Sequence, residues 1–143
     1  MAVTFELPKT AGFAKKQTAD WLVLVASSEG ASIERLSYKA FYREEMIELN
    51  RQFLQHDYDT DIITFAESEA PNPVSADFAL GWDQIALQSQ DLGEVFLKEL
   101  HRILVHGLLH CFGYNDQTEA QRKEIRAKED YYLSIHPSCS TWN

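Results

Sequence analysis

The spacing of hydrophobic residues along the chain predicts a mixture of strands and helices. Stretches in which hydrophobic residues alternate, or in which β-branched residues cluster, predict four strands, which are residues 3–7, 31–38, 61–65 and 74–80. Stretches in which hydrophobic residues recur at intervals of three and four predict five helices, which are residues 11–28, 39–54, 81–93, 94–112 and 117–133. Because the two kinds of element do not alternate strictly, the pattern favours an α+β fold.

The composition is that of one globular domain. The chain has 143 residues, of which 45% are hydrophobic and 12% aromatic, enough for a single core. We therefore expect one domain over residues 1–143, with a small mixed sheet of about four strands and about five helices. The sequence has neither a membrane-spanning hydrophobic stretch nor the pattern of a signal peptide, so a cytoplasmic protein without membrane contacts is expected. In that compartment Cys111 and Cys139 are expected to be free thiols.

Two histidines near the end of the fourth predicted helix suggest half of a metal site. His106 and His110 are four residues apart, so they differ by about 40° around a helix and point from one face. Gly113 can end the helix and turn the chain back, which would bring Asp116 to the same point. Two imidazoles and one carboxylate are the three ligands of a catalytic zinc site that keeps a fourth position for water.

A histidine pair at this spacing can also arise by chance, with each ring hydrogen-bonded in a core. The neighbouring residues favour the metal. They make the helix nearly apolar on most sides, so it should be buried, and four ring nitrogens would then need partners. A metal ion meets much of that demand, while Cys111 points away from His110 and is expected to pack in the core. The apolar neighbours are Leu104, Val105, Leu108 and Leu109.

The stretch HGLLHCFGYND at residues 106–116 resembles the signature of the YbeY family of bacterial rRNA maturation factors. In that family H-G-x-L-H-x-x-G-Y is followed by a third histidine, a position that Asp116 takes here. Residues 49–65 are similar to a second family block, L-N-x-x-[YF]-R followed by T-D-V-L-[ST]-F. The resemblance spans roughly residues 49–132 and implies a mixed sheet with helices around a metal cleft that holds one zinc ion per chain.

The same resemblance implies a single-strand-selective, metal-dependent endoribonuclease. Its expected role is the maturation of ribosomal RNA, at the 3′ end of the small-subunit RNA, and ribosome quality control. Its expected partners are RNA and the small ribosomal subunit with its proteins. A net charge of −9 argues against broad nonspecific RNA binding, although a zinc ion would add two positive charges where the scissile phosphate lies.

The chain departs from the family pattern at a second position. The arginine of the second block, which in the family is thought to face the cleft, falls on Leu54, and leucine cannot bind a phosphate. Arg51 lies three residues earlier on the same predicted helix and is therefore a candidate phosphate contact. An ordinary exposed arginine explains Arg51 equally well.

The remaining histidines and carboxylates are expected to lie outside the site. His101 is about 140° around the helix from His106, too far to share its metal, and His56 and His136 are expected at the surface. Glu94 and Glu99 could contact the ligands from behind but are expected to be solvated. The last predicted helix is expected to present a solvated charged face, with Glu119, Glu124, Glu129 and Asp130 among its charges.

Two other functions compete with RNA hydrolysis. A zinc peptidase of the H-E-x-x-H type needs a glutamate directly after its first histidine, and Gly107 occupies that position. A non-catalytic ribosome assembly factor would hold a structural metal, which usually takes four protein ligands. Near Asp116 the sequence offers only Cys111 as a fourth.

Overall fold

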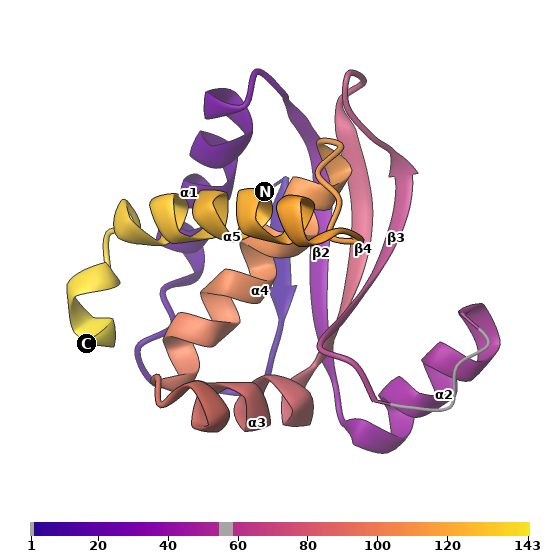
Figure 1. The fold of residues 1–143 in the computed structure, drawn as a ribbon, viewed down its shortest axis with the longest axis vertical. Helices are drawn as coiled ribbons and strands as arrows, with labels where there is room; N and C mark the ends of the chain where they lie inside the picture. The colour runs from indigo at the N-terminus through magenta and orange to yellow at the C-terminus, as the bar shows by residue number, and fades with distance from the viewer. Residues whose placement is uncertain (1, 55–58) are drawn as a thin grey trace.

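The structure is a computed structural model that describes residues 2–54 and 59–143. Within these residues it has four strands, five α-helices and one short 3₁₀ helix. In chain order they are β1 (Val3–Glu6), α1 (Lys15–Ser28), β2 (Ile33–Phe41), α2 (Arg43–Phe53), β3 (Ile62–Ser68), β4 (Val74–Gly81), α3 (Trp82–Leu92), α4 (Phe96–Cys111), α5 (Glu119–Ser134) and η1 (Cys139–Trp142) (Figure 1).

The four strands form one mixed sheet in the order β1-β2-β4-β3. β1, β2 and β4 are parallel, whereas β3 pairs antiparallel with β4. Helix α1 connects β1 to β2, and α2 with β3 connects β2 to β4. The predicted α+β class and mixed sheet are therefore confirmed.

A row of aromatic side chains crosses the parallel part of the sheet and supports α4. Phe5, Tyr38 and Phe78 occupy neighbouring register positions on β1, β2 and β4. Their rings are stacked, with centroids 5.5 and 4.5 Å apart. The buried Tyr38 hydroxyl donates a hydrogen bond to the Leu104 carbonyl at 2.9 Å. This bond fixes the height at which α4 crosses the sheet.

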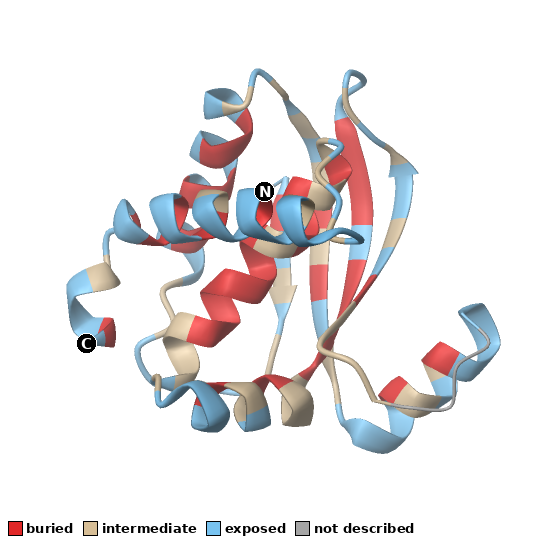
Figure 2. Cartoon of the chain, in the orientation of Figure 1, coloured by how far each residue is buried: buried red, intermediate tan, exposed pale blue. Residues whose placement is uncertain are grey.

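Helix α4 runs between the sheet and α5 and is the most buried helix of the fold (Figures 1 and 2). Between residues 99 and 111, every residue is buried except His106 and His110, which are half-buried. Gly107, between the two histidines, lies against the sheet, where an added Cβ would come within 2.7 Å of Ile62 and 2.9 Å of Phe78. The absence of a side chain at Gly107 thus lets α4 pack closely while the histidines face outward.

One predicted helix boundary was wrong. Residues 39–41 were expected to begin a helix, but they extend β2, because Lys39, Ala40 and Phe41 pair with Ala79, Leu80 and Gly81 of β4. This pairing joins segments about forty residues apart, and the hydrophobic period alone gives no sign of it. The other elements agree with the predictions to within a few residues at each end.

Residues 55–58 and the expected absence of a membrane-spanning segment remain to be considered. His56 lies outside the described residues, as do Asp57 and Tyr58, which begin the second part of the stretch that is similar to the second family block. Among the described helices, none combines the length and hydrophobicity that crossing a membrane requires.

Candidate metal centre

The three predicted ligands meet at one point of the structure. The Nε2 atoms of His106 and His110 are 3.0 Å apart, and Asp116 Oδ2 lies 3.5 Å from the first and 3.3 Å from the second. A tetrahedral zinc ion with bonds of about 2.05 Å would separate its ligand atoms by about 3.3 Å. The three atoms thus already have the spacing of one face of such a tetrahedron, and the cluster is compatible with a metal site.

The opposite nitrogen of each ring is held by an acceptor. His106 Nδ1 lies 2.6 Å from Glu129 Oε2, and His110 Nδ1 lies 2.8 Å from the Tyr114 carbonyl oxygen. A carboxylate and a carbonyl accept hydrogen bonds, so both Nδ1 atoms carry hydrogens and donate. In the neutral rings, both Nε2 atoms then present lone pairs to each other at 3.0 Å. Facing lone pairs repel unless a cation lies between them, and this donor set therefore fits a metal ion.

The loop that carries Asp116 is fixed from a distant part of the chain. Gly113 ends the turn after α4 with φ of 103°, a conformation that favours glycine. The Tyr114 hydroxyl donates to Glu29, after α1, at 2.6 Å, and Tyr132 of α5 donates to the same carboxylate. This anchor places both Asp116 and the carbonyl that orients His110.

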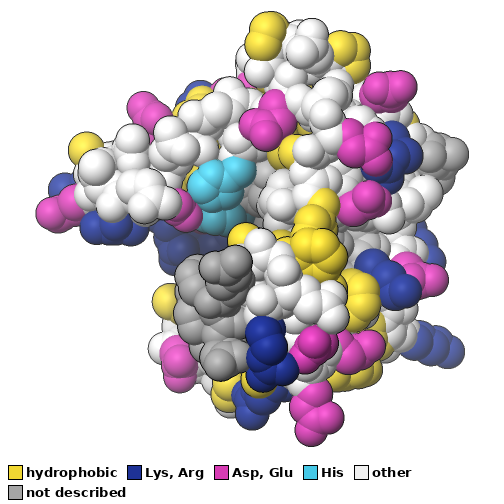
Figure 3. Space-filling model, turned by 90° about the vertical axis from the view of Figure 1, so that its right-hand side faces the viewer, with side chains coloured by type: hydrophobic (Ala, Val, Ile, Leu, Met, Phe, Trp, Pro, Cys, Tyr) yellow, Lys and Arg dark blue, Asp and Glu magenta, His cyan; other side chains and the backbone are white. Residues whose placement is uncertain are grey.

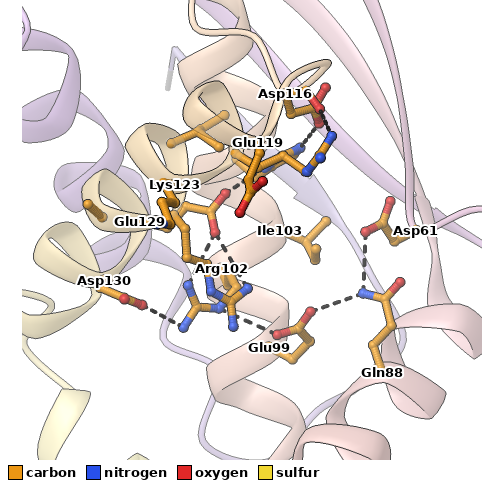
Figure 4. A pocket seen from close by; sticks show the side chains of 15 residues that line it. Asp61, Gln88, Glu99, Arg102, Ile103, Asp116, Glu119, Lys123, Glu129 and Asp130 are labelled. Atoms are coloured by element: carbon orange, nitrogen blue, oxygen red, sulfur yellow. Dashed lines mark hydrogen bonds and ion pairs between the residues drawn. The ribbon is translucent and has the colours of Figure 1, made fainter.

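The carboxylate that orients His106 belongs to a buried ionic cluster. Glu129 is 3% exposed and also accepts a hydrogen bond from Arg102 Nη1 at 3.2 Å. Arg102 contacts Asp130 at 2.9 Å and Glu99 at 3.6 Å, as Figure 4 shows. Burial lowers the pKa of His106, but the hydrogen bond to Glu129 and the negative charge of that residue raise it, and the net result is a raised pKa.

Two expectations about acidic residues were wrong. Glu129 and Glu99 were expected in solvent, yet they are 3% and 2% exposed. Burial raises the pKa of Glu99, and Gln88 donates a hydrogen bond to it at 3.0 Å. The sequence did contain a signal for Glu129, because it lies four residues after Ile125 and three before Tyr132, on the buried stripe of α5.

Two of the candidate ligands, His106 and Asp116, line a cleft of about 620 Å³. Asp61 and Gln88 line one side, α4 forms the floor, and α5 forms the opposite side (Figure 4). In the space-filling view, histidine side chains lie in a hollow with Lys and Arg side chains directly beside them (Figure 3). A polar substrate can therefore reach the three ligand atoms from solvent.

The expected surface position of His136 was wrong. His136 and His101 are 2% and 1% exposed, and the Nε2 atom of each lies 3.1 Å from the Thr18 hydroxyl. His101 Nδ1 donates to the Leu97 carbonyl, whereas His136 Nδ1 accepts from the Ser138 amide. Thr18 therefore accepts from His136 and donates to His101. Both histidines are structural, as expected for His101.

Arg51 is not among the described residues that line the cleft. It lies on α2, with its guanidinium 2.6 Å from Glu48, and the residues that line the cleft come from other elements. Leu54 is 47% exposed at the end of the same helix. The role of Arg51 as a phosphate contact stays a prediction. Cys111 is 1% exposed, which confirms its expected place in the core.

Comparisons with known proteins give a consistent result. A family model described as "Endoribonuclease YbeY" matches residues 8–136. A protein named "Endoribonuclease YbeY" from Cytophaga hutchinsonii is 42% identical over 115 residues, which are 80% of this chain and 80% of the relative. One of the same name from Bacteroides thetaiotaomicron is 35% identical over 137 residues, covering 94% of this chain and 99% of the relative.

A solved structure is similar in fold. The solution structure of a Thermotoga maritima protein aligns with a TM-score of 0.65 and 24% sequence identity, over 92% of this chain and 86% of the other. This likeness supports the arrangement of the mixed sheet and its helices.

Proposed function

Because the chain belongs to the endoribonuclease YbeY family, we propose that it hydrolyses single-stranded RNA at a zinc ion held by His106, His110 and Asp116. The observation that carries this proposal is the convergence of the two Nε2 atoms and the Asp116 carboxylate at the floor of an open cleft. Three protein ligands leave a further coordination position for water or substrate.

The donor set fits zinc. Two imidazoles and one carboxylate form one of the ligand sets of catalytic zinc sites, and the spacing of the ligand atoms is compatible with tetrahedral geometry. When bound, zinc would lower the pKa of a water molecule and polarise a phosphoryl oxygen. The chain's own residues keep both Nε2 atoms free of hydrogens, through Glu129 and the Tyr114 carbonyl, and hold Asp116 on its anchored loop.

The substrate in this proposal is ribosomal RNA at the 3′ end of the small-subunit molecule. The net charge of −9 supports a substrate presented on a particle, because few cations are available to hold long free RNA. Proteins of the small ribosomal subunit would then supply part of the binding surface, in the cytoplasm where the subunit matures. Ribosome quality control follows from the same activity on defective subunits.

Metal analysis tests the site. Purified wild-type protein should contain about one zinc ion per chain, as expected for one three-ligand site. Replacement of any one ligand, as in His106→Ala, His110→Ala or Asp116→Ala, should remove the zinc or weaken its binding strongly. Full zinc occupancy in all three variants would show that the metal lies elsewhere.

An activity assay tests the reaction. Wild type and His110→Ala are incubated with single-stranded RNA, duplex RNA, casein and immature small ribosomal subunits. We expect wild type alone to cleave single-stranded RNA and to process the subunit RNA more efficiently. Cleavage of casein but not RNA would identify a peptidase, and subunit binding without zinc-dependent cleavage would identify an assembly factor. Equal RNA cleavage by both proteins would indicate a contaminating nuclease.

A further inference from the structure

Three cations of α5 line the same cleft as the candidate ligands His106 and Asp116. They are Arg122, Lys123 and Arg126, and all three are exposed to solvent. Their spacing of one and four residues places them on one side of the helix, and four residues advance about 6 Å along its axis. We call these three residues the cationic wall.

Arg122 is held beside the candidate metal site by backbone carbonyls and not by a carboxylate. Its Nη1 donates to the backbone carbonyls of Asp116 and Gln117 at 3.3 and 3.0 Å. Carbonyl partners are neutral, so the guanidinium keeps a full positive charge and further N–H groups for a ligand. A cation thus lies next to the loop that carries the third candidate ligand.

The other two cations of the wall are weakly paired. Among residues 2–54 and 59–143, no ion pair of Lys123 is found, and Arg126 approaches a carboxylate only at 3.9 Å, from Glu129. The Glu129 carboxylate already accepts hydrogen bonds from Arg102 Nη1 at 3.2 Å and from His106 Nδ1 at 2.6 Å. The positive charge of the wall is therefore available to a ligand in the cleft.

Most carboxylates of the cleft already contact a cation or a histidine of the protein. Glu99, Glu129 and Asp130 surround Arg102, and Asp116 faces the two histidines. Two further acids line the cleft, Asp61 and Glu119. Within the cleft, the acids Glu99 and Glu129 are buried beside Arg102, whereas the three residues of the cationic wall are exposed to solvent.

We propose that the cationic wall binds the phosphodiester backbone of the RNA, with Arg122 next to the phosphate at the metal centre and Lys123 and Arg126 on neighbouring phosphates. This inference rests on the proposed function, because it takes RNA as the ligand of the cleft. It gives this acidic chain a local source of phosphate affinity, and the guanidinium of Arg122 can bind a phosphate through two N–H groups. The wall lies on α5, far from Arg51 on α2 (Figure 1).

A salt titration tests the wall. The probe is a fluorescent single-stranded 2′-O-methyl RNA, whose phosphates are intact while cleavage is suppressed, and binding to zinc-loaded protein is followed by anisotropy. The test variant is Lys123→Gln with Arg126→Gln. The matched control is Lys15→Gln with Lys16→Gln on α1, which changes the net charge equally at two exposed residues outside the cleft. Arg122 is kept, because its guanidinium also holds the loop of Asp116.

The expected result is quantitative. Each phosphate contact to a single strand contributes about 0.7 to the slope of log K against log salt, so the test variant should lose about 1.4 in slope and bind about 25-fold more weakly at 0.1 M salt. The control should stay close to wild type, and all proteins should retain their zinc. An equal loss in control and test variants, or no loss in either, would overturn the proposal.

The same samples separate this inference from the proposed function. Unmodified RNA is added to each protein in a parallel cleavage assay. If wild type binds with the steeper slope but does not cleave, the endoribonuclease proposal fails and the cationic wall stands. If wild type cleaves RNA and the test variant binds and cleaves equally well, the function stands and the wall fails.

Discussion

Replacement of Glu129 by glutamine should weaken metal binding without removing a ligand. The Glu129 carboxylate lies 2.6 Å from His106 Nδ1 and is 3% exposed. Its negative charge strengthens the hydrogen bond and makes the opposite nitrogen a better donor to a metal. Glutamine keeps the shape and an acceptor oxygen but removes the charge, and its amide can also turn its NH₂ group toward His106. Variants of such partners typically lose about 10–100-fold in metal affinity, or about 1.4–2.8 kcal/mol.

Asp130 provides a matched control. It follows Glu129 directly and also pairs with Arg102, at 2.9 Å, but no contact between Asp130 and His106 is found among the described residues. Asp130→Asn thus removes an equal charge from the same arginine and leaves His106 untouched. Any loss of affinity through Arg102 or through net charge should appear in both variants.

The assay is competition for zinc with a chromophoric chelator at neutral pH. Urea unfolding of the metal-free proteins checks that both variants fold. We expect Glu129→Gln to release zinc at about 10–100-fold lower chelator strength than Asp130→Asn. Equal affinities of the two variants would refute the reasoning that Glu129 acts on the metal through His106.

Three further outcomes are expected. Asp116→His should retain zinc and move the pH–rate profile to lower pH, because a neutral ligand leaves the metal-bound water more acidic; an unshifted profile with intact metal would remove Asp116 from the ligands. Gly107→Ala should lower the free energy of unfolding in urea by about 1–2 kcal/mol, since the new Cβ would lie 2.7 Å from Ile62; wild-type stability would show that the contact relaxes freely. Burial lowers the pKa of His101 to about 3 and that of His136 to about 4. Between pH 7 and 5 both histidines therefore become protonated in the unfolded chain but stay neutral in the folded protein. Stability should then fall by about 2 kcal/mol per histidine, and His136→Gln should lose about half of this pH dependence; an unchanged dependence would contradict the assignment.

The local part of the candidate metal site could be predicted from the sequence. His106 and His110 are brought together by the period of one helix, and Asp116 by a short turn after Gly113. These relations depend on a few neighbouring residues, which the sequence displays directly. The general fold class could be predicted for the same reason, because each element carries its own hydrophobic period.

The residues that support the ligands could not be predicted in the same way. Glu129 meets His106 only because α5 crosses α4, and Glu29 meets Tyr114 across 85 positions of sequence. The burial of Glu99 likewise depends on Arg102 and Gln88, on two different helices. Such contacts depend on how the helices pack against one another, which the sequence does not display. Because charged residues are rarely buried without a partner, a sequence pattern predicts that they lie in solvent. The wrong helix start at residues 39–41 has the same origin in a distant strand.

The hydroxyl of Thr18, shared by His101 and His136, has a consequence for how the protein is made. His136 is translated long after Thr18 and His101. The same holds for Trp142, which is 4% exposed and packs against both histidines. On the ribosome, the emerging chain therefore has α1 and α4 with an open side, and α5 with Glu129 is likewise still to come. The candidate metal site and the core beneath it therefore close only after α5 and residues 136–142 have been translated.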